Sequence, residues 1–119
     1  MKKQDIITYD KLHGQLLTMK NQFDALSKKN PDGVVNAFKI GLVNKLLEDT
    51  NQLIGDYKPF PDFTVFDNTP NVFNSDVLMI LAHYLTELSR YKMANTKTEK
   101  GVGLSTDWMD TVETWITED

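Results

Sequence analysis

Apolar residues in the first segment recur every three or four positions, which is the spacing of one face of an α-helix. This stripe consists of Tyr9, Leu12, Leu16, Met19, Phe23 and Leu26. Lys28 and Lys29 follow it, where positive charge complements the negative end of a helix. Asn30-Pro31 comes next, and proline cannot continue a helix. The pattern predicts a helix over residues 5–29.

The second segment carries two apolar stripes side by side, and so a wider apolar arc than the first. One stripe comprises Val35, Phe38, Leu42, Leu46 and Leu53, and the other comprises Ile40, Val43, Leu47 and Ile54. Asn30 is a favourable N-cap, Pro31 suits the first helical position, and Gly55 suits the position after the last turn. We predict a helix over residues 31–55 that contacts two neighbouring elements.

Two further helices are predicted in the second half of the chain. Ser75 is a suitable N-cap for a helix over residues 75–94, and Ser105 is one for a shorter helix over residues 105–117. The apolar side of the shorter helix comprises Trp108, Val112, Trp115 and Ile116. Short connections join the first helix to the second and the third to the fourth. The sequence therefore predicts an all-α fold, an antiparallel four-helix bundle forming a single domain over residues 1–119.

The connection between the second and third helices, residues 56–74, is long and unusual in composition. It holds three of the four prolines, which exclude a helix, and five of the twelve aromatic residues, which are too many for a disordered linker. Aromatic rings pack in a protein's own core or anchor an interface. The candidate interaction residues are Tyr57, Phe60, Phe63, Phe66 and Phe73 of this connection, together with Trp108. A small-molecule pocket beneath residues 57–73 is the alternative use.

Charge and composition exclude several classes of function. The chain has 17 acidic and 13 basic residues, a net charge of −4, and no basic cluster, which disfavours nucleic-acid binding. Its longest wholly apolar run, residues 77–82, is far shorter than a membrane-spanning helix requires, so no membrane association is predicted. Asp5 and Asp10 interrupt any export signal. The chain has no cysteine, which fits a reducing compartment, and we expect a cytoplasmic protein.

Few side chains have a spacing that supports catalysis. No Gly-x-Ser-x-Gly motif is present, and the absence of cysteine removes thiol nucleophiles. His13 and His83 are the two histidines, and neither has a His or Cys three or four positions away, so no metal site is predicted. We expect a protein that is not an enzyme and that needs neither metal nor cofactor.

His83 is the one side chain for which the sequence leaves a catalytic alternative. It falls on the polar side of the predicted helix 75–94, opposite Val77 and Leu81. The sequence Ala82-His83-Tyr84-Leu85 resembles the start of the motif of histidine phosphotransfer domains, which are helical bundles of similar length. Thr86 and Glu87 stand where that family has Lys and Gly, which removes the positive charge that steadies a phosphoryl group. The resemblance implies phosphotransfer through His83.

Elimination of these classes leaves protein binding as the leading hypothesis. We expect a non-enzymatic helical interaction module, of the kind that serves as an immunity, accessory or assembly-subunit protein in a bacterium or phage. Its partner is another protein. The apolar stripe of the first helix also resembles a coiled-coil seam, but the charges flanking it are irregular, which favours a monomer over a homodimer. The alternatives are the small-molecule bundle and the phosphotransfer domain.

Overall fold

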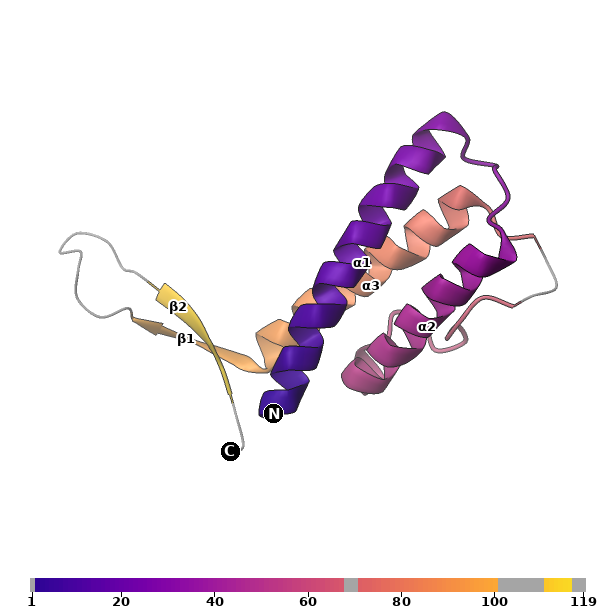
Figure 1. Ribbon diagram of the computed structural model, residues 1–119. Coiled ribbons are helices and arrows are strands. Elements are labelled where there is room, and N and C mark those ends of the chain that lie inside the picture. Colours follow the sequence, from indigo (N-terminus) through magenta and orange to yellow (C-terminus); the bar gives the residue numbers. More distant parts are fainter. Residues whose placement is uncertain (1, 68–70, 101–110, 117–119) are drawn as a thin grey trace.

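Three long helices dominate the computed structural model, which describes residues 2–67, 71–100 and 111–116 (Figure 1). The helices are α1 (Lys3–Lys29), α2 (Ala37–Ile54) and α3 (Asn74–Ala94), and a single 3-10 turn, η1 (Gly55–Tyr57), follows α2. Two short strands, β1 (Thr96–Lys100) and β2 (Thr111–Trp115), come after α3. The prediction of a predominantly helical protein is confirmed.

The core lies mainly between α1 and α3, which pack against each other more extensively than either packs against α2 (Figure 1). The buried side chains of these two helices are Tyr9, Leu12, Leu16 and Phe23 from α1 and Val77, Ile80, Leu81, Tyr84 and Leu88 from α3. Each large apolar side chain removed from water stabilises the fold by roughly 1.5–3 kcal/mol. The apolar stripe of the first segment is therefore the face by which α1 joins the core.

α2 begins six residues later than the sequence predicts, at Ala37 rather than residue 31. Val34 forms an isolated antiparallel bridge with Phe73, and the Val35 amide donates to the Val72 carbonyl at 2.8 Å. These bonds hold residues 34–35 in an extended conformation, which is incompatible with the first turn of a helix. The N-cap of α2 is Asn36, whose side chain accepts a hydrogen bond from the Lys39 amide at 2.8 Å.

The region predicted as a fourth helix, residues 105–117, is not helical where the structure describes it. Residues 111–115 form β2, which pairs antiparallel with β1 from Thr96↔Trp115 to Lys100↔Thr111. The other residues of the predicted helix, Ile116 excepted, lie outside the described residues. The sequence of β2, Thr-Val-Glu-Thr-Trp, is rich in residues that favour strands. The expected four-helix bundle is corrected to three helices and a two-stranded sheet over the described residues.

The two strands form a hairpin that projects from the end of the helical body where α1 begins (Figure 1). The Ile116 amide donates to the Asn95 carbonyl at 2.8 Å and closes the base of the hairpin. The Trp115 ring packs edge-on against Tyr9, with 5.0 Å between the ring centroids, and Lys92 Nζ lies 5.8 Å from the centroid of the same ring. These contacts attach the hairpin to α1 and α3.

Candidate functional site

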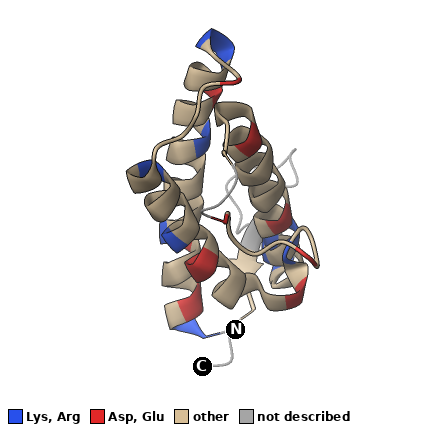
Figure 2. Ribbon diagram, turned by 90° about the vertical axis from the view of Figure 1, so that its right-hand side faces the viewer, with Lys and Arg blue, Asp and Glu red and all other residues tan. Residues whose placement is uncertain are grey.

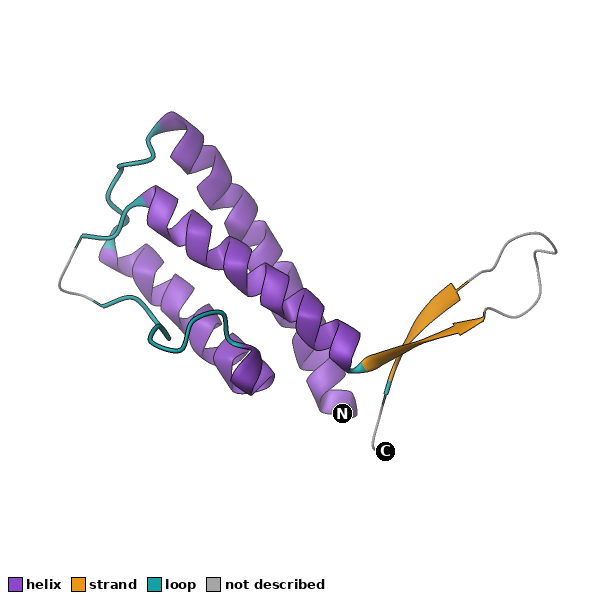
Figure 3. Ribbon diagram, turned by 180° about the vertical axis from the view of Figure 1, so that it is seen from behind, coloured by secondary structure: helices purple, strands orange, loops and turns teal. Residues whose placement is uncertain are grey.

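The long connection between α2 and α3 runs along α2 on the side away from α1 (Figure 3). Two asparagines of α2 hold it in place. The Asn44 side chain donates to the Phe66 carbonyl at 2.9 Å and accepts from the Phe66 amide at 2.8 Å. The Asn51 side chain donates to the Thr64 carbonyl at 3.0 Å and accepts from the Tyr84 hydroxyl at 2.6 Å. These bonds join the connection to α2, and join α2 to α3.

The aromatic rings of this connection lie half-buried. Tyr57, Phe60, Phe63 and Phe66 pack against the core cluster, and Phe73 sits at the start of α3. Phe63 and Phe66 make an edge-to-face pair at 5.1 Å, and Tyr57 makes one with Tyr91 of α3 at 5.8 Å. The rings thus pack on the core and on α3, while the backbone of the connection is bonded to α2, and a further role of the rings as anchors for a partner remains a prediction. Trp108 lies outside the described residues.

The expected pocket beneath residues 57–73 has only a small counterpart in the structure. A hollow of about 300 Å³ lies at the end of this connection, and it is lined by Val34, Val35, Ala37, Ile40, Asp67, Asn71 and Val72. It adjoins the extended residues before α2 rather than the aromatic rings. Its volume is at the lower end of the range of ligand pockets.

His83 is exposed on α3, as the sequence predicts, but the connection lies beside it. The Phe60 ring meets the imidazole edge-on, with 5.0 Å between ring centroids. Arg90 donates to the Glu87 carboxylate at 3.2 Å, so the nearby positive charge is directed to that carboxylate. A phosphoryl group on His83 would therefore lie beside an aromatic ring and near a carboxylate.

Two tyrosines next to the connection have raised pKa values. Burial raises the pKa of the Tyr84 phenol, and the hydrogen bond to Asn51 offsets part of this rise. Burial also raises the pKa of Tyr91, and the Asp5 carboxylate adds to that rise. Both phenols are therefore neutral at neutral pH, where the Tyr84 hydroxyl donates its hydrogen bond to Asn51.

The opposite side of α2 is open and apolar. Of the two stripes on this helix, the one containing Ile40, Val43, Leu47 and Ile54 is buried. The other stripe is only partly covered, because Phe38 is 64% exposed and Leu42 is 53% exposed. The sequence predicts that α2 contacts two neighbours along this wide arc. On the exposed part of the second stripe, the described residues provide no such neighbour.

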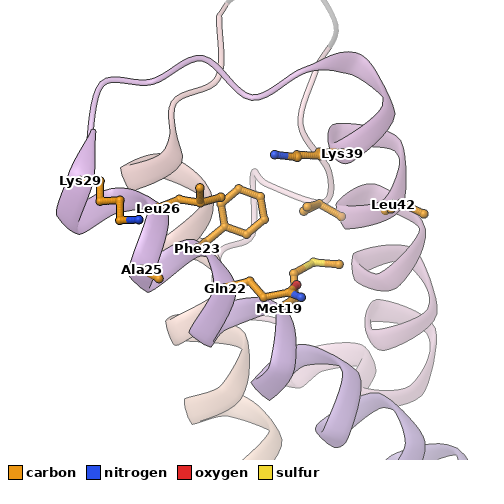
Figure 4. Close-up of a pocket in the computed structure, with 9 residues that line it drawn as sticks. Met19, Gln22, Phe23, Ala25, Leu26, Lys29, Lys39 and Leu42 are labelled. Carbon is orange, nitrogen blue, oxygen red and sulfur yellow. The ribbon is translucent and has the colours of Figure 1, made fainter.

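A groove between α1 and α2 lies beside these exposed side chains. At one end it has a volume of about 530 Å³, and its apolar lining residues are Met19, Phe23, Ala25, Leu26, Leu42 and Val43. Figure 4 shows Met19 and Phe23 pointing from α1 toward α2. We call this part the apolar end of the α1–α2 groove. Leu26, which belongs to the predicted stripe of the first helix, is 36% exposed here.

The groove continues along the whole seam between the two helices. A second hollow of about 740 Å³ shares Met19, Gln22 and Leu42 with the apolar end. A third of about 620 Å³ shares Lys11, Gln15 and Asp49 with the second. The lining becomes polar along this path. The α1–α2 groove thus extends along α1 from its N-terminal turn to its C-terminal turn, and along α2 from Lys39 to Leu53, which is about 21 Å of helix at 1.5 Å per residue.

Two lysines stand at the apolar end of the groove, one on each helix. Lys29 lies in the last turn of α1, which is basic (Figure 2), and Lys39 lies in the first turn of α2. Figure 4 shows Lys39 pointing from α2 back toward α1. Neither lysine forms an ion pair with a carboxylate in the described ranges, whereas Lys45 farther along pairs with Asp49 at 3.1 Å. The apolar end therefore carries two lysines without a carboxylate partner among the described residues, of which Lys29 also lies at the negative end of the α1 dipole.

Other kinds of site are not found in the part of the chain that the structure describes. There, no three His, Asp or Glu side chains converge as metal ligands. None of the helices within the described ranges is long and apolar enough to cross a bilayer. Comparison with known proteins gives no match to any family model, curated protein or solved structure. The groove and the covered side of α2 are therefore the candidate sites among the described residues.

Proposed function

We propose that this protein is a non-enzymatic interaction module that binds a partner protein in the α1–α2 groove. The observation that carries the proposal is the uncovered apolar stripe of α2. Phe38 and Leu42 are one helical turn apart, and both are more than half exposed. Large apolar side chains gathered beside a groove are typical of surfaces that a partner covers. Immunity, accessory and assembly-subunit proteins of bacteria or phages are the classes that this proposal favours.

The proposal includes a monomer in the cytoplasm that binds neither nucleic acid nor membrane. The net charge of −4 opposes binding to phosphate backbones, and the absence of cysteine fits a reducing compartment. Light scattering at micromolar concentration should give a mass near 13.6 kDa. A stable dimer that dissociates when Leu42 is replaced by Gln would instead assign the groove to a second copy of this chain.

The two alternatives have weaker support from geometry. The hollow beside residues 67–72 is small for a ligand pocket, and it does not lie under the aromatic rings. At His83, the Phe60 ring approaches the imidazole, and Glu87 is on the same helix one turn later. Incubation with acetyl phosphate should leave His83 unlabelled. Acid-labile label that is lost in His83→Gln would favour the phosphotransfer domain instead.

A pull-down from the native host tests the main proposal. The bait proteins are the wild type, the groove variant Phe38→Gln/Leu42→Gln, and the matched control Met79→Gln/Met93→Gln, which changes two exposed apolar residues of α3. A stoichiometric partner should be recovered with the wild type and the control but lost with the groove variant. Thermal unfolding of all three proteins checks that they fold equally well. Retention of the same partner by the groove variant would contradict the proposal.

A further inference from the structure

We infer that the occupant of the α1–α2 groove is an amphipathic α-helix of the partner, with carboxylates at the end that lies between Lys29 and Lys39. This inference rests on the proposed function and specifies the partner's chemistry. It follows from three properties of the groove, which are the backbone of its walls, the position of its apolar residues and the position of two lysines without a carboxylate partner among the described residues.

The walls of the groove favour a helix over an extended segment. Both walls are α-helices, Lys3–Lys29 and Ala37–Ile54, whose backbone groups are bonded internally over most of their length. An extended peptide would find no free backbone donors or acceptors on these walls, although it would lose water from its own amides. A helix satisfies its own backbone and needs only to offer an apolar stripe. The elongated shape of the groove matches such an element.

The apolar residues define where that stripe would lie. At the apolar end, Met19 and Phe23 point from α1 toward α2 (Figure 4), and Leu42 of α2 also lines this end. Phe38 extends this surface by one turn along α2, at a spacing of four residues from Leu42. A partner helix with apolar residues at positions i, i+3, i+4 and i+7 would cover these side chains. It would supply the second neighbour that the wide apolar arc of α2 predicts.

The charges define which end of the partner is acidic. Lys29 and Lys39 flank the apolar end and have no carboxylate partner among the described residues. The amides of the first turn of α2, next to Lys39, add the positive end of a helix dipole. Lys28 nearby is already paired with Asp24 at 3.4 Å. Carboxylates on the partner helix would therefore gain two ion pairs at this end, where the apolar lining reduces screening by water.

Two designed helical peptides test the inference by fluorescence anisotropy. Each has 21 residues, a fluorescein label and the same leucine stripe, and they differ only in carrying three Glu or three Lys at one end. The proteins are the wild type, the variant Lys29→Glu/Lys39→Glu, and the control Lys20→Glu/Lys58→Glu, which makes the same change in net charge at residues that do not line the groove. A fourth protein, Leu42→Gln, removes an apolar lining residue.

The acidic peptide should bind the wild type and the control about tenfold more tightly than the basic peptide, a factor typical of close charge pairs in a partly dry interface. The preference should reverse in Lys29→Glu/Lys39→Glu. Leu42→Gln should weaken both peptides by a similar factor. Binding of neither peptide at millimolar concentration, or equal binding of both to the wild type, would overturn the inference.

The remaining outcomes separate this inference from the proposed function. Displacement of the acidic peptide by decanoate at equal concentration would assign the groove to a small amphiphilic acid and overturn the helical partner. A wild-type protein that dimerises through the groove would assign it to a second copy, with the same effect. If the peptides fail but the groove variant still loses its host partner, the proposed function stands and only the helical, acidic partner is wrong.

Discussion

The two sides of α2 differ in how the rest of the chain covers them. On one side, the connection between α2 and α3 is bonded to Asn44 and Asn51, and its aromatic rings pack against the core. On the other side, Leu42 lines the α1–α2 groove, and Leu42 and Phe38, one turn away, remain more than half exposed. The covered side of α2 presents the polar side chains of Asn44 and Asn51, whereas the open side presents Phe38 and Leu42. The difference shows that the chain covers the part of α2 to which it can form hydrogen bonds and leaves an apolar part exposed.

On the covered side of α2, Asn44 and Asn51 form hydrogen bonds with the backbone of the connection, and these bonds explain why this side is covered. The amide of a single asparagine, Asn44, bonds both backbone groups of Phe66, so the extended chain there loses little hydrogen bonding when it leaves water. The prolines of the connection reduce the entropy lost when it becomes ordered. No comparable anchor was found across the groove among the described residues. An occupant there must bring its own satisfied backbone, as a helix does.

The largest expected effect separates buried from exposed leucines on α2. Leu47 is fully buried, so Leu47→Ala should lower the free energy of unfolding by about 3 kcal/mol, through lost transfer energy and the cavity left behind. Leu42→Ala should lower it by less than about 0.5 kcal/mol, because Leu42 is already 53% exposed. Urea denaturation measures both values. Equal losses of stability would mean that both stripes belong to the core, and they would contradict the distinction between a buried and an exposed stripe of α2.

Asn44 should have the next largest effect, since it holds the covered side together. Asn44→Ala leaves the Phe66 amide and carbonyl without their partner, and we expect a loss of about 1–3 kcal/mol in the free energy of unfolding. Asn21→Ala, at an exposed position of α1, serves as the control and should be nearly neutral. Urea denaturation compares the two. An Asn44 variant as stable as the control would show that the connection does not depend on these bonds.

A moderate effect should appear at alkaline pH. Burial raises the pKa of Tyr84 above 10.0, so ionisation of this phenol is easier in the unfolded chain than in the folded one. Its stabilising contribution is complete below pH 10 and is lost as the pH rises through the higher pKa of the folded state. Urea denaturation between pH 9 and about 11.5 should show this fall.

Tyr84→Phe sharpens this test because it removes the ionisable group. The fall in stability with pH should become shallower in this variant, with a remaining part from Tyr91, whose pKa is also raised by burial. A Tyr84→Phe variant with an unchanged slope would mean that this phenol is not buried on the covered side of α2.

The smallest expected effect is that of Phe38→Ala, which we compare with a half-buried phenylalanine of the connection. Phe38 is 64% exposed, so Phe38→Ala should change the free energy of unfolding by less than about 0.5 kcal/mol. Phe66 packs against the core and against Phe63, so Phe66→Ala should cost about 1–3 kcal/mol. Thermal unfolding monitored by circular dichroism measures both. A Phe38 variant that is as unstable as the Phe66 variant would place Phe38 in the core rather than on a free surface.

Local patterns predicted the helical segments whose apolar faces meet the core. The stripe of the first segment places Leu12, Leu16 and Phe23 in the core, and Gly55 at the end of α2 has the positive φ of 55° that its position suggested. Such features depend on residues a few positions apart. The start of α2 was wrong by six residues because it depends on Val34 and Val35 bonding to residues 72–73, which are distant in sequence. The predicted fourth helix was wrong over residues 111–115 for the same reason, since β2 exists by pairing with β1.

The sequence predicted the residues of the candidate site but not which of them are exposed. From the sequence alone it follows that α2 has two apolar stripes and that the connection of residues 56–74 is rich in aromatic rings. Periodicity identifies an apolar face, but it contains no information on which neighbour covers that face. Only the tertiary structure decided that the connection is bonded to one side of α2 with its rings packed on the core, and that Phe38 and Leu42 stay exposed. The reason is physical, because burial depends on contacts between segments that are far apart along the chain.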